Sequence, residues 1–420
     1  MKLDRWFLGA SAIGALNTVN AYRPLARKRA GGVLAFALGW PTSEEPLFTI
    51  GLQGVAVAAA ARRGALRSPI GKAGLALTAV SWAALARLAA QADRVADLFE
   101  DRLVAGLGPD YRTEIPAGTR AEPPINLAER VLPSLGQRRR YRNIRKLEYG
   151  DFGRRNRLDI WSAADLHPGD KAPVILHVHG GGWVVGNEQV QGEVLLSEMA
   201  RRGWVGVAIT YRLSPKATWP DHIIDVKRAI AWTREHIAEY GGDPDFIAIT
   251  GGSAGGHLCS LAALTPSDPE YQPGFESADT SVQAAVPLYG VYDVGDLAGT
   301  GDRQIADVWD RIVAKARPDA DPVAVSRASP ITRVNADAPP MFVIHGANDT
   351  LVPVEQARRF VERLRALSGQ LVIYAELPGT QHGFEVYRSV RGLHTSRAIA
   401  RFLEVVHTRW SERSQPAPVG

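Results

Sequence analysis

A serine within a run of small residues is the first candidate for chemistry in this chain. Ser253 lies in the segment G-G-S-A-G over 251–255, after an apolar run and before a helical pattern over 256–264. A serine at an abrupt strand-to-helix turn is held in a strained conformation with its hydroxyl exposed, and small neighbours such as Gly251 and Gly255 let the two elements approach closely. Glycine-rich turns also occur as structural turns or phosphate-binding loops, so the pentapeptide alone leaves a catalytic role open.

A second glycine-rich segment, H-G-G-G-W over 179–183, follows the buried strand expected near 174–179. Consecutive glycines permit backbone N–H groups to point into a cavity. Acyl transfer needs such donors at the oxygen that becomes negative in the tetrahedral intermediate. We therefore expect an oxyanion hole formed by the amides of Gly181, Gly182 and Ala254, the last of which also has the positive end of a helix dipole behind it.

The residues around these amides are expected to support the loop. His179 is interpreted as ordering it through ring hydrogen bonds, with Gly180 and Trp183 as neighbours that complete the turn. His177 and His179 alternate along a strand, but no carboxylate or cysteine at metal-ligand spacing accompanies them. No metal and no cofactor are predicted.

An acid and then a histidine follow the serine along the chain, which is the order expected for the partners of a serine in a G-x-S-x-G turn. Asp349 comes just after the apolar strand expected at 341–346, where open α/β sheets gather their sites. His382 lies in the loop after another strand, expected at 371–377. His382 would accept the proton of Ser253 and return it to the leaving group, while Asp349 would fix the ring tautomer.

These motifs resemble those of the hormone-sensitive-lipase-like esterases of the α/β-hydrolase superfamily. The resemblance extends to Y-R-L-S-P at 211–215 and Y-G-G-D-P-D at 240–245, and it covers roughly residues 140–412. It implies an α/β-hydrolase fold and a serine esterase. Two positions depart from the family pattern: Gly252 stands where the family usually has aspartate, and Lys216 where it often has glutamate. Neither departure removes a catalytic atom, but with them the family pattern no longer predicts the detailed shape of the substrate pocket.

Alternating strands and helices predict an α/β fold with a mostly parallel central sheet flanked by helices. An antiparallel hairpin is expected at its start, and a helical cap over 291–334. We expect an apolar helical segment over 1–91 and a linker or cap region over 92–140. A catalytic α/β-hydrolase domain is expected over 141–412, and a disordered tail over 413–420. Helical spacing over 91–107 suggests a helix across the mouth of the active site, and the final helix is expected over 389–410.

The first 91 residues contain little polar surface and several arginine clusters. Their apolar runs are each shorter than the roughly 20 residues of a straight transmembrane helix, which favours shallow or re-entrant membrane helices. We expect association with a bacterial-type cell membrane through residues 1–91. The side of the catalytic domain and the number of crossings stay open, and a soluble helical cap on a cytoplasmic enzyme is the alternative.

Composition excludes few classes. The net charge of +5 arises largely from arginines near the N-terminal third rather than from a basic, aromatic-rich stripe, so nucleic acid is not an expected partner. The single cysteine permits no intrachain disulfide. The oligomeric state cannot be inferred from these features.

The combined motifs predict a serine carboxylic-ester hydrolase, of the esterase or lipase type, that forms an acyl-enzyme on aliphatic or lipidic esters. The alternatives are an amidase or deacetylase with the same triad, and a non-catalytic ligand receptor on the same fold. A small-molecule or lipid ester is therefore the expected ligand. If the apolar segment acts only in membrane attachment, deleting the residues before about 92 leaves ester turnover unchanged.

Overall fold

The computed structural model describes residues 3–414 apart from 28, 133–140, 190, 298, 300–302 and 317–320. Of the tail expected over 413–420, the first two residues belong to the last helix, and the rest lie outside the described residues.

An eight-stranded sheet forms the centre of the molecule, in the order β1-β2-β4-β3-β5-β6-β7-β8. Strands β1 and β2 pair antiparallel, as do β2 and β4, and all other neighbours are parallel. The predicted mostly parallel α/β sheet with an opening hairpin is therefore confirmed. The strands are β1 Arg142–Glu148, β2 Arg157–Trp161, β3 Ala172–Val178, β4 Val205–Ile209, β5 Gly242–Gly252, β6 Ala284–Leu288, β7 Met341–Gly346 and β8 Val372–Leu377.

The central strands are apolar along their whole length because helices cover both faces of the sheet. Every residue of β4, β6 and β7 is buried, whereas the edge strand β8 alternates between buried and half-buried positions. The principal covering helices are α6 Glu193–Arg201, α7 Asp221–His236, α8 Ala254–Leu264, α12 Val354–Leu367 and α13 Val390–Ser414. The final helix is thus present as predicted, a few residues longer.

One apolar core lies on each side of the sheet. The first includes Ile230 of α7, Leu258 of α8 and Phe360 of α12. The second includes Met199 of α6 and Phe402 of α13. Short helical turns connect these layers at η2 Tyr111–Glu114, α5 Leu127–Val131, η5 Gly153–Arg155, η6 Ile237–Tyr240 and η7 Pro269–Tyr271.

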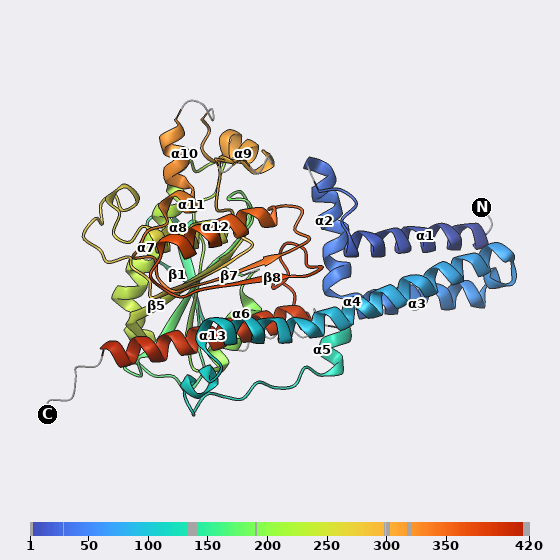
Figure 1. Cartoon of the computed structure of the whole chain (residues 1–420), viewed down its shortest axis with the longest axis horizontal. Coiled ribbons are helices and arrows are strands. Elements are labelled where there is room, and N and C mark those ends of the chain that lie inside the picture. Colours follow the sequence, from blue (N-terminus) through green and yellow to red (C-terminus); the bar gives the residue numbers. More distant parts are fainter. Residues whose placement is uncertain are drawn as a thin grey trace.

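A helical insertion lies between β6 and β7, where the cap was predicted. Its helices are α9 Gln304–Val308, η8 Trp309–Val313, α10 Pro322–Ala328 and α11 Pro330–Arg333. Figure 1 shows α9 and α10 beyond one edge of the layered body. Trp309 is buried in the core on the α7–α8 side of the sheet, so the insertion is packed onto the body.

The N-terminal segment forms α1 Leu3–Tyr22, α2 Arg29–Glu44, α3 Pro46–Arg62, η1 Ala65–Arg67 and α4 Pro69–Leu107. Figure 1 shows α1, α3 and the first part of α4 extending side by side away from the sheet, with α2 between them and the body. We call α1, α3 and residues 69–88 of α4 the arm. The segment boundary predicted at residue 91 falls inside α4, and the division into domains stays a prediction.

The helix predicted over 91–107 is present as the second half of α4, but its expected position is wrong. Val95, Phe99 and Leu103 belong to the same core as Phe402 of α13, so this helix packs against the sheet. It is not part of the active-site mouth, because the helix beside that mouth is α2. The apolar spacing of residues 91–107 reflects burial in the core.

Among the described residues, α4 is the one helix long and apolar enough to cross a membrane. This test depends on length and composition alone, and a helix in the core of a soluble protein passes it too. Of the most apolar window of α4, 28% is buried inside the protein.

Candidate active site

Ser253 occupies the turn between β5 and α8 in a conformation that side chains rarely adopt. Its φ is 59° and its ψ is −120°. The approach of strand and helix leaves no room at the flanking positions: a Cβ on Gly251 would lie 2.5 Å from the carbonyl oxygen of Val178, and one on Gly255 would lie 2.1 Å from it. The local sequence therefore permits this turn because both neighbours lack side chains.

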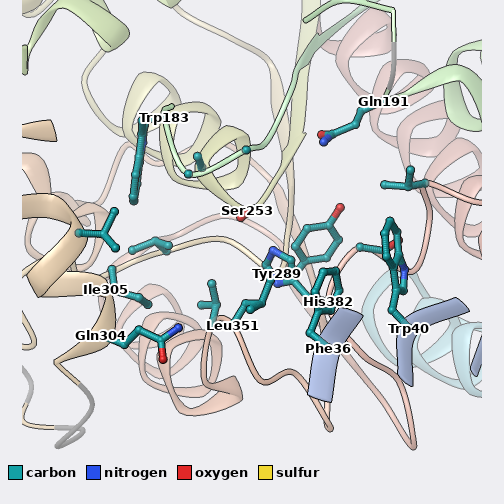
Figure 2. Close-up of a pocket in the computed structure, with 18 residues that line it drawn as sticks. Phe36, Trp40, Trp183, Gln191, Ser253, Tyr289, Gln304, Ile305, Leu351 and His382 are labelled. Atoms are coloured by element: carbon teal, nitrogen blue, oxygen red, sulfur yellow. The ribbon is translucent and has the colours of Figure 1, made fainter. Parts of the chain in front are cut away.

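His382 and Asp349 meet in the neighbouring loops, as their positions after β8 and β7 predicted. Nδ1 of His382 lies 2.6 Å from Oδ2 of Asp349. A carboxylate can only accept, so Nδ1 carries a proton and donates it to Asp349, which leaves Nε2 for a second partner. His382 and Ser253 line the same pocket, and Figure 2 shows the imidazole beside the serine.

The carboxylate of Asp349 is buried but well satisfied. Its Oδ1 accepts hydrogen bonds from the amides of Leu351 and Val352, each 2.8 Å long. Nε2 of His345 also lies 3.3 Å from its Oδ2. Burial by itself would raise the pKa of Asp349, but His382 and His345 outweigh it and hold that pKa well below its ordinary value. Asp349 is therefore ionised at neutral pH and can orient the His382 ring.

The glycine loop lies beside Ser253 on the other side of the pocket. Gly181 has φ +118°, and a Cβ there would lie 2.1 Å from the carbonyl oxygen of Val185. Gly181 and Gly182 line the pocket together with Ala254. The amide of Ala254 is the first N–H of α8 and has no partner within that helix. The sequence-predicted oxyanion donors are thus gathered around one space.

The role expected of His179 agrees with its contacts. Its Nδ1 lies 2.7 Å from the carbonyl oxygen of Gly180, and its ring stacks on Tyr211 at 4.4 Å. Burial lowers the pKa of His179 to about 4, so the ring is neutral and Nδ1–H can donate. The amide of Gly180 donates to Oε1 of Gln191 at 2.6 Å. This amide is therefore occupied, which leaves those of Gly181 and Gly182 for a substrate.

Trp183 connects the glycine loop to the cap. Its Nε1–H donates to Nδ1 of His257 at 3.2 Å, and Nε2 of His257 lies 2.8 Å from the carbonyl oxygen of Ala328 in α10. Burial lowers the pKa of His257 to about 4. A neutral ring with its proton on Nε2 satisfies both contacts, so this chain of hydrogen bonds fixes the loop without carrying charge.

The pocket around Ser253 has a volume of about 380 Å³. Its walls are mainly apolar. In Figure 2, Ile305 and Leu351 lie on one side of Ser253, while Phe36 and Trp40 lie on the other, beyond His382. An apolar pocket with a few convergent polar groups is typical of a site for a small molecule.

Several residues of the site were missed by sequence reasoning. Phe36 and Trp40 come from α2, and no local pattern reveals that this helix folds over a loop more than 300 residues later. Trp40 Nε1 donates to the carbonyl oxygen of Gly383 at 3.0 Å, and the Phe36 ring meets the His382 ring edge-on at 6.0 Å. Tyr289 carried a usable signal, because it directly follows β6 at the edge of the sheet where sites gather.

Comparisons with known proteins agree on one class. The family model BD-FAE matches residues 158–364. The probable carboxylic ester hydrolase LipM of Mycobacterium tuberculosis is 47% identical over 415 residues, which cover 98% of this chain and 95% of LipM. The esterase LipQ of the same organism is 45% identical over 76% of each chain. The structure of the esterase Est2 of Thermogutta terrifontis has a TM-score of 0.52 and 29% identity, and the match covers 66% of this chain and 94% of that one.

Proposed function

Because this chain belongs to the hormone-sensitive-lipase-like esterases of the α/β-hydrolase superfamily and is a carboxylic ester hydrolase, we propose that Ser253, His382 and Asp349 are its catalytic triad. The observation that carries this assignment is the 2.6 Å contact between His382 and Asp349 at the wall of the pocket that holds the strained Ser253. The ionised carboxylate of Asp349 beside His382 supports the roles of acid and base in this triad.

In the first half of the proposed reaction, Oγ of Ser253 attacks the carbonyl carbon of the ester while Nε2 of His382 accepts the hydroxyl proton. The carbonyl oxygen becomes negative and receives hydrogen bonds from the amides of Gly181, Gly182 and Ala254. Collapse of this intermediate breaks the bond to the alcohol, which leaves with the proton from His382. The acyl group stays on Ser253.

In the second half, a water molecule gives its proton to Nε2 of His382 and attacks the acyl carbon. The same three amides stabilise the second intermediate, and Ser253 leaves with the proton that returns from the imidazolium. Asp349 stays ionised throughout and stabilises the charged ring. No group outside the chain and the water is needed for these steps.

The direct test compares ester turnover in the wild type, Ser253→Ala and Ser260→Ala. Ser260 lies on the same helix, but its hydroxyl is buried and donates to the carbonyl oxygen of Gly256 at 2.7 Å. We expect Ser253→Ala to lose on the order of 10⁴-fold or more in kcat, because the whole triad depends on the nucleophile. Ser260→Ala should retain turnover. Wild-type turnover in Ser253→Ala would reject the assignment.

We further propose that the substrate carries an apolar acyl or alkyl group. The pocket walls beyond the polar centre are formed by aliphatic and aromatic side chains, including Val291, Ile305, Val308 and Val352. Burying one methylene of the substrate there contributes about 0.8 kcal/mol. A series of p-nitrophenyl esters should therefore show kcat/KM rising from acetate to butyrate or longer acyl chains. A steady fall from acetate onward would contradict an apolar substrate.

We also propose that the arm binds a lipid surface. Its outer faces carry large apolar side chains that are far from buried, such as Ile13 at 72%, Val55 at 70% and Val80 at 68% exposed. Large apolar side chains that are exposed on one unit of a protein are typical of surfaces that contact a membrane or another protein. The tip of the arm adds exposed Arg62, Arg63 and Arg67, which suit a negatively charged membrane surface.

The inner face of the arm combines buried apolar side chains, such as Leu85 and Leu88, with buried hydroxyl groups. Thr18 and Ser81 share a hydrogen bond of 2.7 Å between α1 and α4, and Thr78 donates to Ser11 at 3.0 Å. Gly74 lets the two helices approach, since a Cβ there would lie 2.9 Å from the Phe7 ring. Small and hydroxyl-bearing residues inside with apolar residues outside are typical of helices that pack in lipid. The buried hydroxyl pairs inside the arm, together with the exposed aliphatic side chains outside it, are the observation that supports membrane association.

Sedimentation with vesicles that contain anionic lipid tests the membrane proposal. We expect the double variant Val55→Lys and Val80→Lys to sediment much less than the wild type, because two charges then face the acyl chains. Val323→Lys is the matched control: Val323 is 61% exposed but lies on the cap, in α10. All variants should hydrolyse a soluble ester at the wild-type rate. Equal sedimentation of the double variant and the wild type would contradict binding through the arm.

A further inference from the structure

The glycine before the nucleophile has a specific physical reason in this chain. Gly252 stands where the related esterases usually have aspartate, and the structure has no room for any side chain there. A Cβ on Gly252 would lie 2.3 Å from the hydroxyl oxygen of Tyr289. The phenol of Tyr289 therefore occupies the place that a side chain at position 252 would need.

Tyr289 also contacts the candidate general base. Its ring lies 4.3 Å from the His382 ring, between centroids, at an angle of 59°. Phe36 approaches the same imidazole edge-on at 6.0 Å. Tyr289 itself is held with φ 36°, a region that non-glycine residues seldom adopt, and its side chain is buried. The orientation of the His382 ring therefore depends on where this phenol is fixed.

A buried carboxyl group fixes the phenol. The hydroxyl of Tyr289 donates a short hydrogen bond to Oε1 of Glu385, three residues after His382. Glu385 is 4% exposed, and among the described residues its Oε2 has no hydrogen-bond partner. A buried carboxyl without a full set of partners is costly to keep, and such groups are concentrated at functional sites.

The groups around this carboxyl are few. Glu44 at the end of α2 is close enough to act on Glu385 electrostatically, but Glu44 is itself paired with the buried Arg391 of α13 and accepts a 2.9 Å bond from Ser389. Asp349 lies within electrostatic range of the Tyr289 phenol. Burial first, and Glu44 to a lesser degree, raise the pKa of Glu385 to about 7, while the bond from Tyr289 opposes them.

We propose that Tyr289 and Glu385 are a positioning pair for His382: the carboxyl group of Glu385 anchors the phenol, and the phenol ring fixes the imidazole at the angle that Ser253 requires. This inference rests on the proposed triad. In the related esterases, the residue before the serine usually carries a carboxyl group. Here Glu385, in the loop after β8, carries a carboxyl group instead, and the Tyr289 hydroxyl that it holds fills the space beside Gly252. When Glu385 is ionised, its charge also stabilises the imidazolium of the transition state.

Three variants and one control test the pair: Tyr289→Phe, Glu385→Gln, the double variant, and Tyr292→Phe. Tyr292 is an equally buried tyrosine nearby that stacks on Phe360 at 4.2 Å. Turnover of p-nitrophenyl butyrate is measured from pH 5.5 to 9, and covalent labelling with a fluorophosphonate counts the active sites. Glu385→Gln keeps an acceptor for the phenol, so it tests the charge if Tyr289→Phe fails to fold.

We expect Tyr289→Phe to lose about tenfold in kcat, because misplacing a catalytic group slows its step, while KM changes by no more than about twofold. In the wild type, ionisation of Glu385 should contribute to a rise in kcat near pH 7. In Glu385→Gln this contribution should be absent, so kcat should rise less over the same pH range. The double variant should be no slower than the slower single variant, since the two residues act as one unit. Tyr292→Phe should match the wild type at every pH.

Wild-type kcat and pH dependence in Tyr289→Phe would overturn the pair, as would an equal loss in Tyr292→Phe or fully additive losses in the double variant. Failure of the triad itself gives a different result. Full turnover by Ser253→Ala would remove the proposed nucleophile and this inference with it.

Discussion

At the scale of single residues, the site depends on side chains whose charge states are fixed by burial and by their hydrogen-bonding partners. Asp349 is ionised because His382 and His345 outweigh its burial. His257 is neutral, with its two ring nitrogens bonded to Trp183 and Ala328. With Nδ1 of His382 donating to Asp349, Nε2 is left for Ser253.

The role of Asp349 predicts the effect of a change that preserves its shape. In Asp349→Asn, the amide can donate to His382 and so favours the wrong ring tautomer, with Nε2 protonated. We expect kcat to fall by on the order of 10³- to 10⁴-fold with little change in KM. Steady-state kinetics beside the exposed control Asp337→Asn measure this effect. A loss below about tenfold would mean that Asp349 does not orient the base.

Glu385 predicts an unusual dependence of stability on pH. Burial raises its pKa from the ordinary 4.5 to about 7, so the folded chain binds this proton more tightly than the unfolded chain. Its contribution to stability is therefore present below pH 4.5 and is lost as the pH rises to 7, by up to about 3 kcal/mol.

Glu385→Gln should remove this loss. We expect the variant to gain thermal stability relative to the wild type at pH 8 but not at pH 4.5, as measured by the difference in Tm between the two proteins. Glu362→Gln, at an exposed position on α12, is the control and should show no such pH-dependent gain. An equal Tm difference at both pH values would be inconsistent with a buried carboxyl of raised pKa.

At the scale of elements, the sequence predicted what is local. The strand before Ser253, the glycine loop, and the strands before Asp349 and His382 follow from apolar runs that end in glycine-rich turns, and the order along the chain placed them at one edge of the sheet. The cap between β6 and β7 and the opening hairpin were predicted by the same reasoning.

The elements that the sequence could not place are those whose position depends on distant contacts. The spacing of residues 91–107 predicted a helix, but the same apolar stripe suits a helix over the pocket or one under the sheet. Its burial with Phe402 selects the second. Helix α2 was not expected at the pocket but lies beside it. A short apolar helix gives no sign that Trp40 will reach the carbonyl oxygen of Gly383.

The glycine loop predicts a sharp intolerance to side chains. In Gly181→Ala, the added Cβ would meet the carbonyl oxygen of Val185 at 2.1 Å, in a region of φ that disfavours alanine. The loop must shift and misplace its amides, so we expect kcat to fall by about 10²- to 10³-fold, the cost of one oxyanion donor.

Gly169→Ala separates this effect from simple backbone strain. Gly169 has φ +93° with no atom within 4 Å of the added Cβ, so the substitution strains the chain without a clash. We expect it to lower Tm slightly and to leave kcat unchanged. If Gly181→Ala kept wild-type kcat, the amides of this loop would not be the oxyanion donors.

At the scale of the whole molecule, the N-terminal segment belongs to the active site as well as to the arm. Phe36 and Trp40 line the pocket, and the loop that carries Asp349 is bonded to the same segment. Asn348 donates to the carbonyl oxygen of Tyr22 at 2.8 Å, and Thr350 donates to that of Gly32 at 2.9 Å. A membrane-bound arm would therefore hold the pocket close to the lipid surface.

These contacts argue against a segment that acts only in membrane attachment. We predict that a chain lacking residues 1–91 loses most turnover even of short, soluble esters, because one wall of the pocket and the supports of the acid loop are absent. Within the full chain, Trp40→Ala should give a smaller loss, about tenfold in kcat/KM, from the lost wall and the lost bond to Gly383. Unchanged turnover in both proteins would show that α2 does not contribute to the active site.

The most direct measurement is the mass of the intact protein after reaction with a fluorophosphonate, followed by mapping of the modified peptide. Such a reagent reacts with a serine only when a neighbouring base activates it. The account predicts one adduct per chain, on Ser253, which is absent in Ser253→Ala and strongly slowed in Asp349→Asn. An adduct of equal yield in Ser253→Ala, or one mapped to another serine, would contradict the central claim.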